Sequence, residues 1–206
     1  MLALLLAAVT LPPPPAAVIV FKSGERVTVT GPADSAGHPD FPWLVQDTLV
    51  SPRGDAAAVR FCYEPPGFRF CEVHLARPGL PTITLKNSSV LRLLWSADGR
   101  SLIGAGTNTV RRWNLSGGVR VATPAPPLIE PGVTQSVSVI TRLWLDRGNL
   151  CVAAQDQLFD MQGQQKRRTV TTTRYALPTL KGLTTTSSPA SAGREEAQCM
   201  RVRRSD

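Results

Sequence analysis

The chain has 206 residues, of which 42% are hydrophobic, and this is enough for one domain with a substantial core. Only 18% of the residues are charged, whereas Pro (18) and Gly (16) are frequent. This balance argues against a helical protein and favours a sheet protein with many turns. The net charge is +8, and its excess lies in residues 104–206, which carry 14 basic and 7 acidic side chains. No apolar run reaches the ~20 residues of a membrane-spanning helix, so we expect no integral membrane span.

The chain begins with a short apolar run, Leu2–Leu11, which has the length of a signal-peptide core. Prolines and two small residues, Ala16 and Ala17, follow it. We therefore expect residues 1–17 to be a signal peptide or apolar leader, and the protein to be periplasmic or secreted. No Lys or Arg precedes the run, so a hydrophobic tail on a cytoplasmic protein stays open as the alternative.

A pair of cysteines flanks a turn in "RFCYEPPGFRFCEV", residues 60–73. If the Pro-Gly pair is the centre of the turn, Cys62 lies opposite Cys71 on the neighbouring strand. Opposed residues bring their Cβ atoms close to the separation that a disulfide requires, so the sequence predicts this bridge. The total of four cysteines is even, as an oxidising compartment favours. The remaining pair, Cys151 and Cys199, is a second predicted bridge, although we expect the two on different sheets.

One turn recurs along the chain. "WSADG" (95–99) is matched by "VSPRG" (50–54) and by "WLDRG" (144–148). An apolar strand precedes each turn, a strand of small apolar residues follows it, and two further short strands complete each unit. In the central turn, Asp98 is expected to accept backbone hydrogen bonds, as Asp-Gly pairs do. The final glycines of the turns, spaced by 45 and 49 residues, are Gly54, Gly99 and Gly148. The predicted four-stranded units are 43–86, 87–123 and 136–174.

These units resemble the blades of a β-propeller of the WD-repeat or TolB-like kind. The resemblance is clearest in 87–122, which carries the Ser-x-Asp-Gly turn and a Trp-Asn pair, Trp113 and Asn114, where the family has Trp-Asp. It extends over 43–174 but departs from the family pattern, because no Gly-His pair precedes the first strand. The resemblance implies that the tryptophans at equivalent places belong to the core. They are Trp95, Trp113 and Trp144.

The two ends of the chain are expected to complete a fourth blade. A Ser-Gly turn near the N-terminus is similar to one in the central unit, and a glycine lies 45 residues after Gly148. We therefore predict that 18–30 and 180–204 each supply half a blade. The predicted fold is an all-β, small β-propeller of about four four-stranded blades, closed by N- and C-terminal strands in a single domain, 18–206. The alternative is an incomplete three-blade array, in which 183–193 is a linker and a partner chain covers the open edge.

The sequence carries no recognisable catalytic motif. His38 and His74 have no nucleophile elbow nearby, and the chain lacks a Cys-x-x-Cys pair and a phosphate-binding loop. We expect no catalytic, cofactor or metal site, and we expect an exported, non-catalytic binding or scaffold module whose partner is a protein or peptide. A propeller-based hydrolase is one alternative.

A second alternative is binding of an anionic polymer through the basic C-terminal half. The same side chains also suit a strand that faces water, and no aromatic residues interleave with them to stack on bases. The candidate anion-binding residues are Lys166, Arg167, Arg168, Arg174, Arg201, Arg203 and Arg204.

Overall fold

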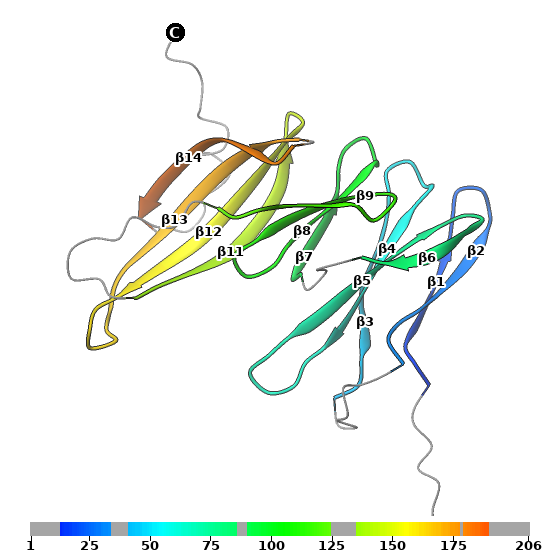
Figure 1. Cartoon of the computed structure of the whole chain (residues 1–206), viewed down its shortest axis with the longest axis horizontal. Coiled ribbons are helices and arrows are strands. Elements are labelled where there is room, and N and C mark those ends of the chain that lie inside the picture. Colours follow the sequence, from blue (N-terminus) through cyan, green and yellow to red (C-terminus); the bar gives the residue numbers. More distant parts are fainter. Residues whose placement is uncertain (1–12, 34–40, 86–89, 125–134, 178, 190–206) are drawn as a thin grey trace, which may run out of the picture.

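The protein is all-β. The computed structural model describes residues 13–33, 41–85, 90–124, 135–177 and 179–189, and leaves the side chains of 166, 167, 188 and 189 undescribed. These residues contain strands and turns and no helix, so none of them forms a helix that could cross a membrane. The strands form one two-stranded and three four-stranded antiparallel sheets, which stand in a row in a propeller-like arrangement (Figure 1).

Each sheet is built from strands that are consecutive in the chain and paired in chain order. The N-terminal hairpin contains β1 (Ala16–Val20) and β2 (Arg26–Thr30). The first sheet contains β3 (Leu44–Val50), β4 (Ala57–Tyr63), β5 (Phe70–Arg77) and β6 (Leu80–Thr84). The second sheet contains β7 (Arg92–Trp95), β8 (Ser101–Ala105), β9 (Val110–Asn114) and β10 (Val119–Ala122). The third sheet contains β11 (Gln135–Asp146), β12 (Asn149–Phe159), β13 (Gln165–Ala176) and β14 (Lys181–Pro189).

The turns between strands lie at two opposite ends of the sheets, and the two ends carry different turns. We call the end that carries the turns β1–β2, β3–β4, β7–β8 and β11–β12 the upper end, and the opposite end, which carries β4–β5, β8–β9 and β12–β13, the lower end (Figure 1). Because consecutive strands are antiparallel, every unit contributes its first turn to the upper end and its second turn to the lower end. The two ends can therefore carry different chemistry.

The first and second sheets pack face to face around Trp113, which is fully buried. A Cβ atom placed on Gly104 would lie 2.9 Å from the Trp113 ring and 3.1 Å from Val90, so a side chain at this position would displace the ring. Trp95 joins the same core, and its indole N–H donates a hydrogen bond across the interface to the carbonyl of Leu49 at 3.0 Å. The expectation that Trp95 and Trp113 are core residues is thus confirmed.

The second and third sheets share another core, in which Ile103 and Val110 meet Leu150 and Val152. Trp144 belongs to neither of these cores, contrary to expectation. It alternates with the core positions of β11, so it lies on the outer face of the third sheet, where the guanidinium of Arg142 sits 5.7 Å from its ring centre.

Equivalent serines close the first turns of the first two sheets. The N–H of Gly54 donates to the carbonyl of Ser51 at 2.8 Å, and the N–H of Gly99 donates to the carbonyl of Ser96 at 2.9 Å. Both glycines have positive φ angles, 75° and 66°, which favour glycine. The hydroxyl of Ser96 also accepts from the N–H of Ser101 at 3.0 Å. The turn that repeats in the sequence therefore has the same structure in the first and second sheets.

The corresponding turn of the third sheet has a different construction. Arg147 and Gly148 alone join β11 to β12, with φ angles of 47° and 77°. Two consecutive residues with positive φ form the tight turn that joins strongly paired hairpins. The shared Trp and Gly in "WLDRG" therefore do not indicate the longer serine turn.

The third sheet also corrects the predicted boundaries. The expected unit was 136–174, but the sheet extends from Gln135 to Pro189, and β12 runs unbroken through Asn149–Phe159. The expectation that residues 180–204 complete the blade begun by 18–30 is also wrong for 181–189, because β14 pairs with β13. β14 and the N-terminal hairpin lie at opposite ends of the row (Figure 1). The described strands thus correspond to the open array, and residues 190–204 lie outside the described part.

The N-terminal hairpin is part of the core. Ile19 and Phe21 are buried against Val59 and Phe61 of the first sheet. Val18, which alternates with Ile19 along β1, is 60% exposed. The hairpin therefore buries one face only, and that face protects the first sheet from water.

We predict that Ile19→Ala and Phe21→Ala each lower the free energy of unfolding by about 2–5 kcal/mol, because each leaves a cavity in this core. Val18→Ala is the matched control and should change it by less than ~0.5 kcal/mol. Urea unfolding of the three variants beside the parent measures this. Equal midpoints for Ile19→Ala and Val18→Ala would show that the hairpin is not part of the folded unit.

Candidate functional site

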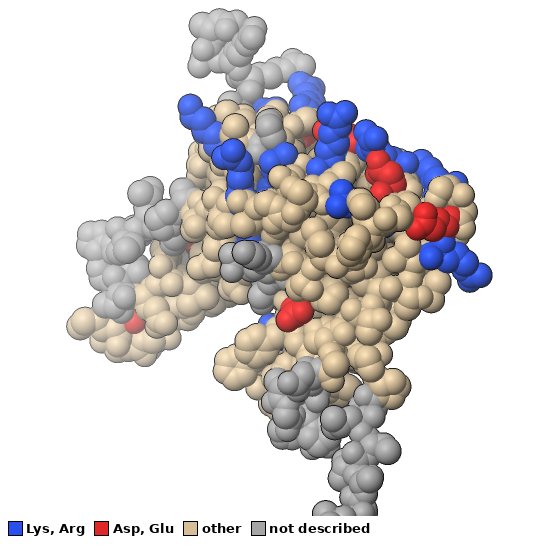
Figure 2. Space-filling model, turned by 45° about the vertical axis from the view of Figure 1, so that its right-hand side comes forward, with Lys and Arg blue, Asp and Glu red and all other residues tan. Residues whose placement is uncertain are grey.

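Charged side chains are concentrated at the upper end of the molecule. Figure 2 shows Lys and Arg along the upper rim, with a few acidic groups between them, while the lower part of the same face is mostly uncharged. The described sequence explains this distribution, because the upper turns carry Lys22, Arg53, Arg100 and Arg147. The lower turn β4–β5 instead carries apolar and aromatic residues between Glu64 and Arg69.

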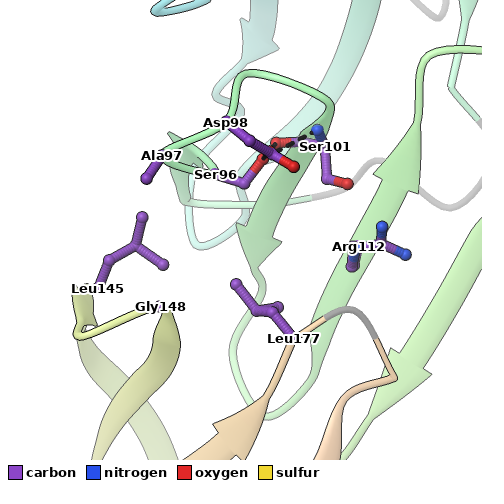
Figure 3. A pocket seen from close by; sticks show the side chains of 8 residues that line it. All are labelled: Ser96, Ala97, Asp98, Ser101, Arg112, Leu145, Gly148 and Leu177. Atoms are coloured by element: carbon purple, nitrogen blue, oxygen red, sulfur yellow. Dashed lines mark hydrogen bonds between the residues drawn. The ribbon is translucent and has the colours of Figure 1, made fainter.

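A half-open pocket of about 300 Å³ lies at the upper end between the second and third sheets (Figure 3). Asp98 and Arg112 supply its charged groups, and Leu145 and Leu177 supply apolar wall from the third sheet. Figure 3 shows that Asp98 comes from the β7–β8 turn, while Arg112 faces the pocket from β9. The remaining lining residues are Ser96, Ala97, Ser101 and Gly148.

Asp98 is held by the turn that contains it. The hydroxyl of Ser96 donates to its carboxylate at 2.6 Å, and the backbone N–H of Arg100 donates at 3.0 Å. These two hydrogen bonds hold the pKa of Asp98 below its ordinary value of 3.8, and the nearby Arg100 and Arg112 act in the same direction. One carboxylate oxygen accepts both bonds, so the main role of Asp98 is to fix the turn, as the sequence predicts.

Burial lowers the pKa of Arg112, and the charge of Arg120 lowers it further. The two arginines are direct partners across β9 and β10. Asp98 acts in the opposite direction on Arg112. The pocket lining thus contains one carboxylate, Asp98, and one guanidinium, Arg112, and the nearby Arg100 and Arg120 make its surroundings positively charged.

A second candidate lies at the lower end of the first sheet, where five aromatic side chains form what we call the aromatic patch. They are Phe41, Trp43, Tyr63, Phe68 and Phe70. Tyr63 is its centre, with ring centres 5.8 Å from Trp43, 6.3 Å from Phe70 and 6.4 Å from Phe41. Phe68 extends the row, 6.2 Å from Phe70 with nearly parallel rings. Phe68 and Phe70 are 69% and 50% exposed, so the row leads from a buried tyrosine to the surface.

A disulfide lies directly behind the aromatic patch. Cys62 and Cys71 are cross-strand partners in β4 and β5 and are bonded, as the sequence predicts. They form the pair next to Tyr63 and Phe70 in the register and therefore fix the base of the hairpin tip. Cys151 is buried and is also disulfide-bonded. Cys199, its predicted partner, lies outside the described residues.

The opposite face of the same hairpin end has an open pocket of about 420 Å³. Its wall includes Leu44, Cys62 and Phe41. Its rim carries an ion pair between Nε of Arg69 and Oε1 of Glu64, which are 2.5 Å apart. Because Phe41 belongs to both the pocket and the aromatic patch, the two surfaces meet. A partner could therefore contact the hairpin tip from either face.

The predicted C-terminal basic residues do not form a patch within the described part of the chain. Arg168 and Arg174 lie on the same face of β13, six residues and therefore about 20 Å apart. Arg174 is half-buried and lies 3.9 Å from Asp146. Lys166 and Arg167 have no described side chains. The remaining members, Arg201, Arg203 and Arg204, lie outside the described residues.

His74 is a packed residue of the first sheet. Its ring lies 5.0 Å from that of Phe61, and its Nε2 is 3.4 Å from Glu72 and 3.5 Å from the hydroxyl of Thr84. His38 lies outside the described residues. Within the described ranges, no group of three or more His, Cys, Asp and Glu side chains could hold a metal ion.

One buried polar group, the fully buried carboxylate of Asp156, was not predicted from the sequence. It accepts hydrogen bonds from the hydroxyls of Ser138 on β11 and Thr171 on β13. Thr171 also lies 3.0 Å from the hydroxyl of Ser187 on β14. This row connects all four strands of the third sheet and satisfies Asp156 with neutral donors, which makes it a structural network.

Comparison with known proteins gives little additional information. No family model matches the chain, so the WD-repeat resemblance is not supported at the level of a family, and no curated protein matches it. Among solved structures, the chain is similar to the periplasmic gluconolactonase PpgL of Pseudomonas aeruginosa, with 15% sequence identity and a TM-score of 0.36. The match covers 86% of this chain and spans 64% of that structure.

We predict that replacing both Cys62 and Cys71 by Ala lowers the free energy of unfolding by about 2–3 kcal/mol, because the bridge closes a loop of about ten residues. Urea unfolding of the double variant beside the oxidised parent measures this. Peptide mapping without reductant should recover the two cysteine peptides joined. Recovery of both as free thiols from native material would contradict the bridge.

The lowered pKa of Asp98 predicts a pH-dependent contribution to stability. Because the folded-state pKa lies below the unfolded value, the contribution is complete above about pH 4 and is lost as pH falls through the folded pKa. Asp98→Asn should therefore be less stable than the parent at pH 7, with a smaller difference at pH 3. Urea titrations at both pH values test this. An unchanged difference would show that the charge of Asp98 has no role in the turn.

Proposed function

We propose that this protein is a non-catalytic binding module of propeller type that takes a protein partner on the aromatic patch. The observation that carries the proposal is the pair of exposed, stacked rings of Phe68 and Phe70 on a disulfide-fixed hairpin tip. Exposed clusters of large apolar side chains mark interaction surfaces in folded proteins. Aromatic residues are also enriched at the centres of protein interfaces.

The composition of the patch supports a protein partner. Leu44, 61% exposed, and Val45, 39% exposed, are further apolar side chains on β3 of the same sheet end. The charges nearby, Arg69 and Glu64, already neutralise each other. A surface with an apolar centre and a satisfied ion pair beside it has the arrangement expected of a protein interface, in which charged residues are depleted from the centre.

The hairpin tip is also held in place before a partner arrives. The disulfide fixes its base, and Tyr63 packs against Trp43 and Phe70 from the buried side. A surface that needs no ordering on binding loses less conformational entropy. The disulfide further supports a role outside the cytoplasm, because such bonds persist in oxidising compartments. No observation in the described residues favours the hydrolase alternative.

The test compares the parent with Phe68→Ala/Phe70→Ala. Both side chains are exposed, so the double variant should fold, while loss of the two exposed rings should weaken partner binding at least about 100-fold. The parent, immobilised on resin, is exposed to a native envelope fraction, and the retained protein is then titrated against each variant. Val18→Ala/Leu80→Ala removes apolar surface that is 60% and 47% exposed at other places and is the matched control. Equal retention by the parent and the Phe68→Ala/Phe70→Ala variant would refute the proposal.

A further inference from the structure

The upper end has a basic surface that the aromatic patch does not explain. Figure 2 shows its Lys and Arg side chains as a band of separate groups along the rim, with a few acidic groups between them. The exposed basic residues of the described turns and adjoining strand ends come from the hairpin and from all three sheets. They include Lys22, Arg53, Arg100, Arg120, Arg147 and Lys181. Since neighbouring packed sheets stand about 10 Å apart, these charges are distributed along the row rather than gathered at one point.

Acidic groups at the upper end are already engaged. Asp55 accepts from Arg53 at 2.7 Å and from the hydroxyl of Ser51 at 3.0 Å. The carboxylate of Glu25 accepts from the backbone N–H of Gly79 at 2.7 Å. As described above, Asp98 is held within its own turn. These acids fix turns, and only Arg53 among the basic rim residues is neutralised by a described ion pair.

Arg112 and Arg120 form a like-charged cross-strand pair in β9 and β10. Like charges placed directly opposite each other in a sheet are destabilising, and no described carboxylate lies within ion-pair distance of either guanidinium. Arg112 faces the 300 Å³ pocket (Figure 3). An acid group that entered this pocket would relieve the repulsion and would gain charge-assisted hydrogen bonds from a planar guanidinium.

The surroundings indicate the class of ligand. Near the upper end, Phe21, Trp95, Trp113 and Tyr175 are buried, and Trp144 is half-buried on the outer face of the third sheet with Arg142 against its ring. No aromatic side chain lines the pocket, so the pocket itself offers no ring on which a nucleic-acid base could stack. The pocket is small and half-open, which suits one acid group of a longer molecule. A flexible polymer with repeated acid groups matches a band of separated basic side chains.

We propose that the upper end binds an acidic polysaccharide, with one carboxylate or sulfate group in the pocket beside Arg112 and further acid groups along the basic rim. This site is separate from the aromatic patch and does not depend on it. It also differs from the C-terminal residues that the sequence indicated. Affinity for such a polymer falls with salt concentration, because binding releases counterions.

Heparin, a sulfated uronate polymer, is the probe. We expect the parent to bind immobilised heparin. The affinity should fall steeply between about 50 and 200 mM NaCl, the range over which salt strongly weakens such contacts. Arg112→Ala/Arg120→Ala should lose about tenfold or more in affinity at the lower salt and show a shallower salt dependence. Lys166→Ala/Arg168→Ala removes the same charge from the third sheet and is the matched control, which should keep most of the affinity.

Two further measurements keep the test decisive. Arg112 is half-buried, so Arg100→Glu/Arg120→Glu, which alters exposed side chains only, repeats the test without disturbing the pocket wall. A single-stranded oligonucleotide of equal charge serves as competitor and should displace the protein less effectively than free heparin. Equal losses in the rim and control variants, binding that does not respond to salt, or stronger displacement by the oligonucleotide would each overturn the proposal.

Discussion

The burial of Trp113 between the first and second sheets is the contact on which the rest of the structure depends. A β-sheet must bury its apolar face against another element, so each sheet here requires a neighbour. The indole of Trp113 fills the space between two sheets because Gly104 on the adjacent strand has no side chain to occupy it. The Trp95 hydrogen bond to Leu49 fixes the same two sheets in register. The second sheet, once placed, supplies Ile103 to the next core.

This dependence explains why the two ends of the molecule can differ so strongly. The cores lie between the sheets and use the middle of each strand, so the turns are free to vary without loss of packing. Serine and glycine close the upper turns of the first two sheets with backbone hydrogen bonds, and basic side chains extend from these turns. At the lower end, the β4–β5 hairpin continues past the core and carries the aromatic patch on its exposed tip.

The sequence predicted those features that local chemistry determines. The turn at Ser96 and its counterpart at Ser51 were visible because the hydroxyl, the acceptor and the glycine lie within five residues of one another. The Cys62–Cys71 bridge was visible for the same reason, since the hairpin register follows from the turn between them. The aromatic patch was not visible, because Trp43 reaches Tyr63 only after β3 pairs with β4.

The boundaries of the third sheet were predicted wrongly for a related reason. Asp156 lies inside β12, although an unpaired carboxylate is costly to bury. Its partners, Ser138 and Thr171, lie on neighbouring strands and are distant in the sequence. β14 was misassigned because the period of the first two units was extended to a sheet whose strands are longer. Hydroxyl-rich stretches such as 183–188 are therefore poor guides to where a sheet ends.

The covalent bridge behind the aromatic patch has a consequence for the response of the protein to proteases. The tip between Cys62 and Cys71 is the most exposed apolar turn of the first sheet, and extended tips of this kind are preferred sites for proteases. A cut at any bond of this tip leaves the two pieces joined through sulfur. β4 and β5 stay paired with each other and with the rest of the sheet. The cleaved chain then migrates as one species in a gel without reductant and as two after reduction, and it retains its fold despite the broken backbone.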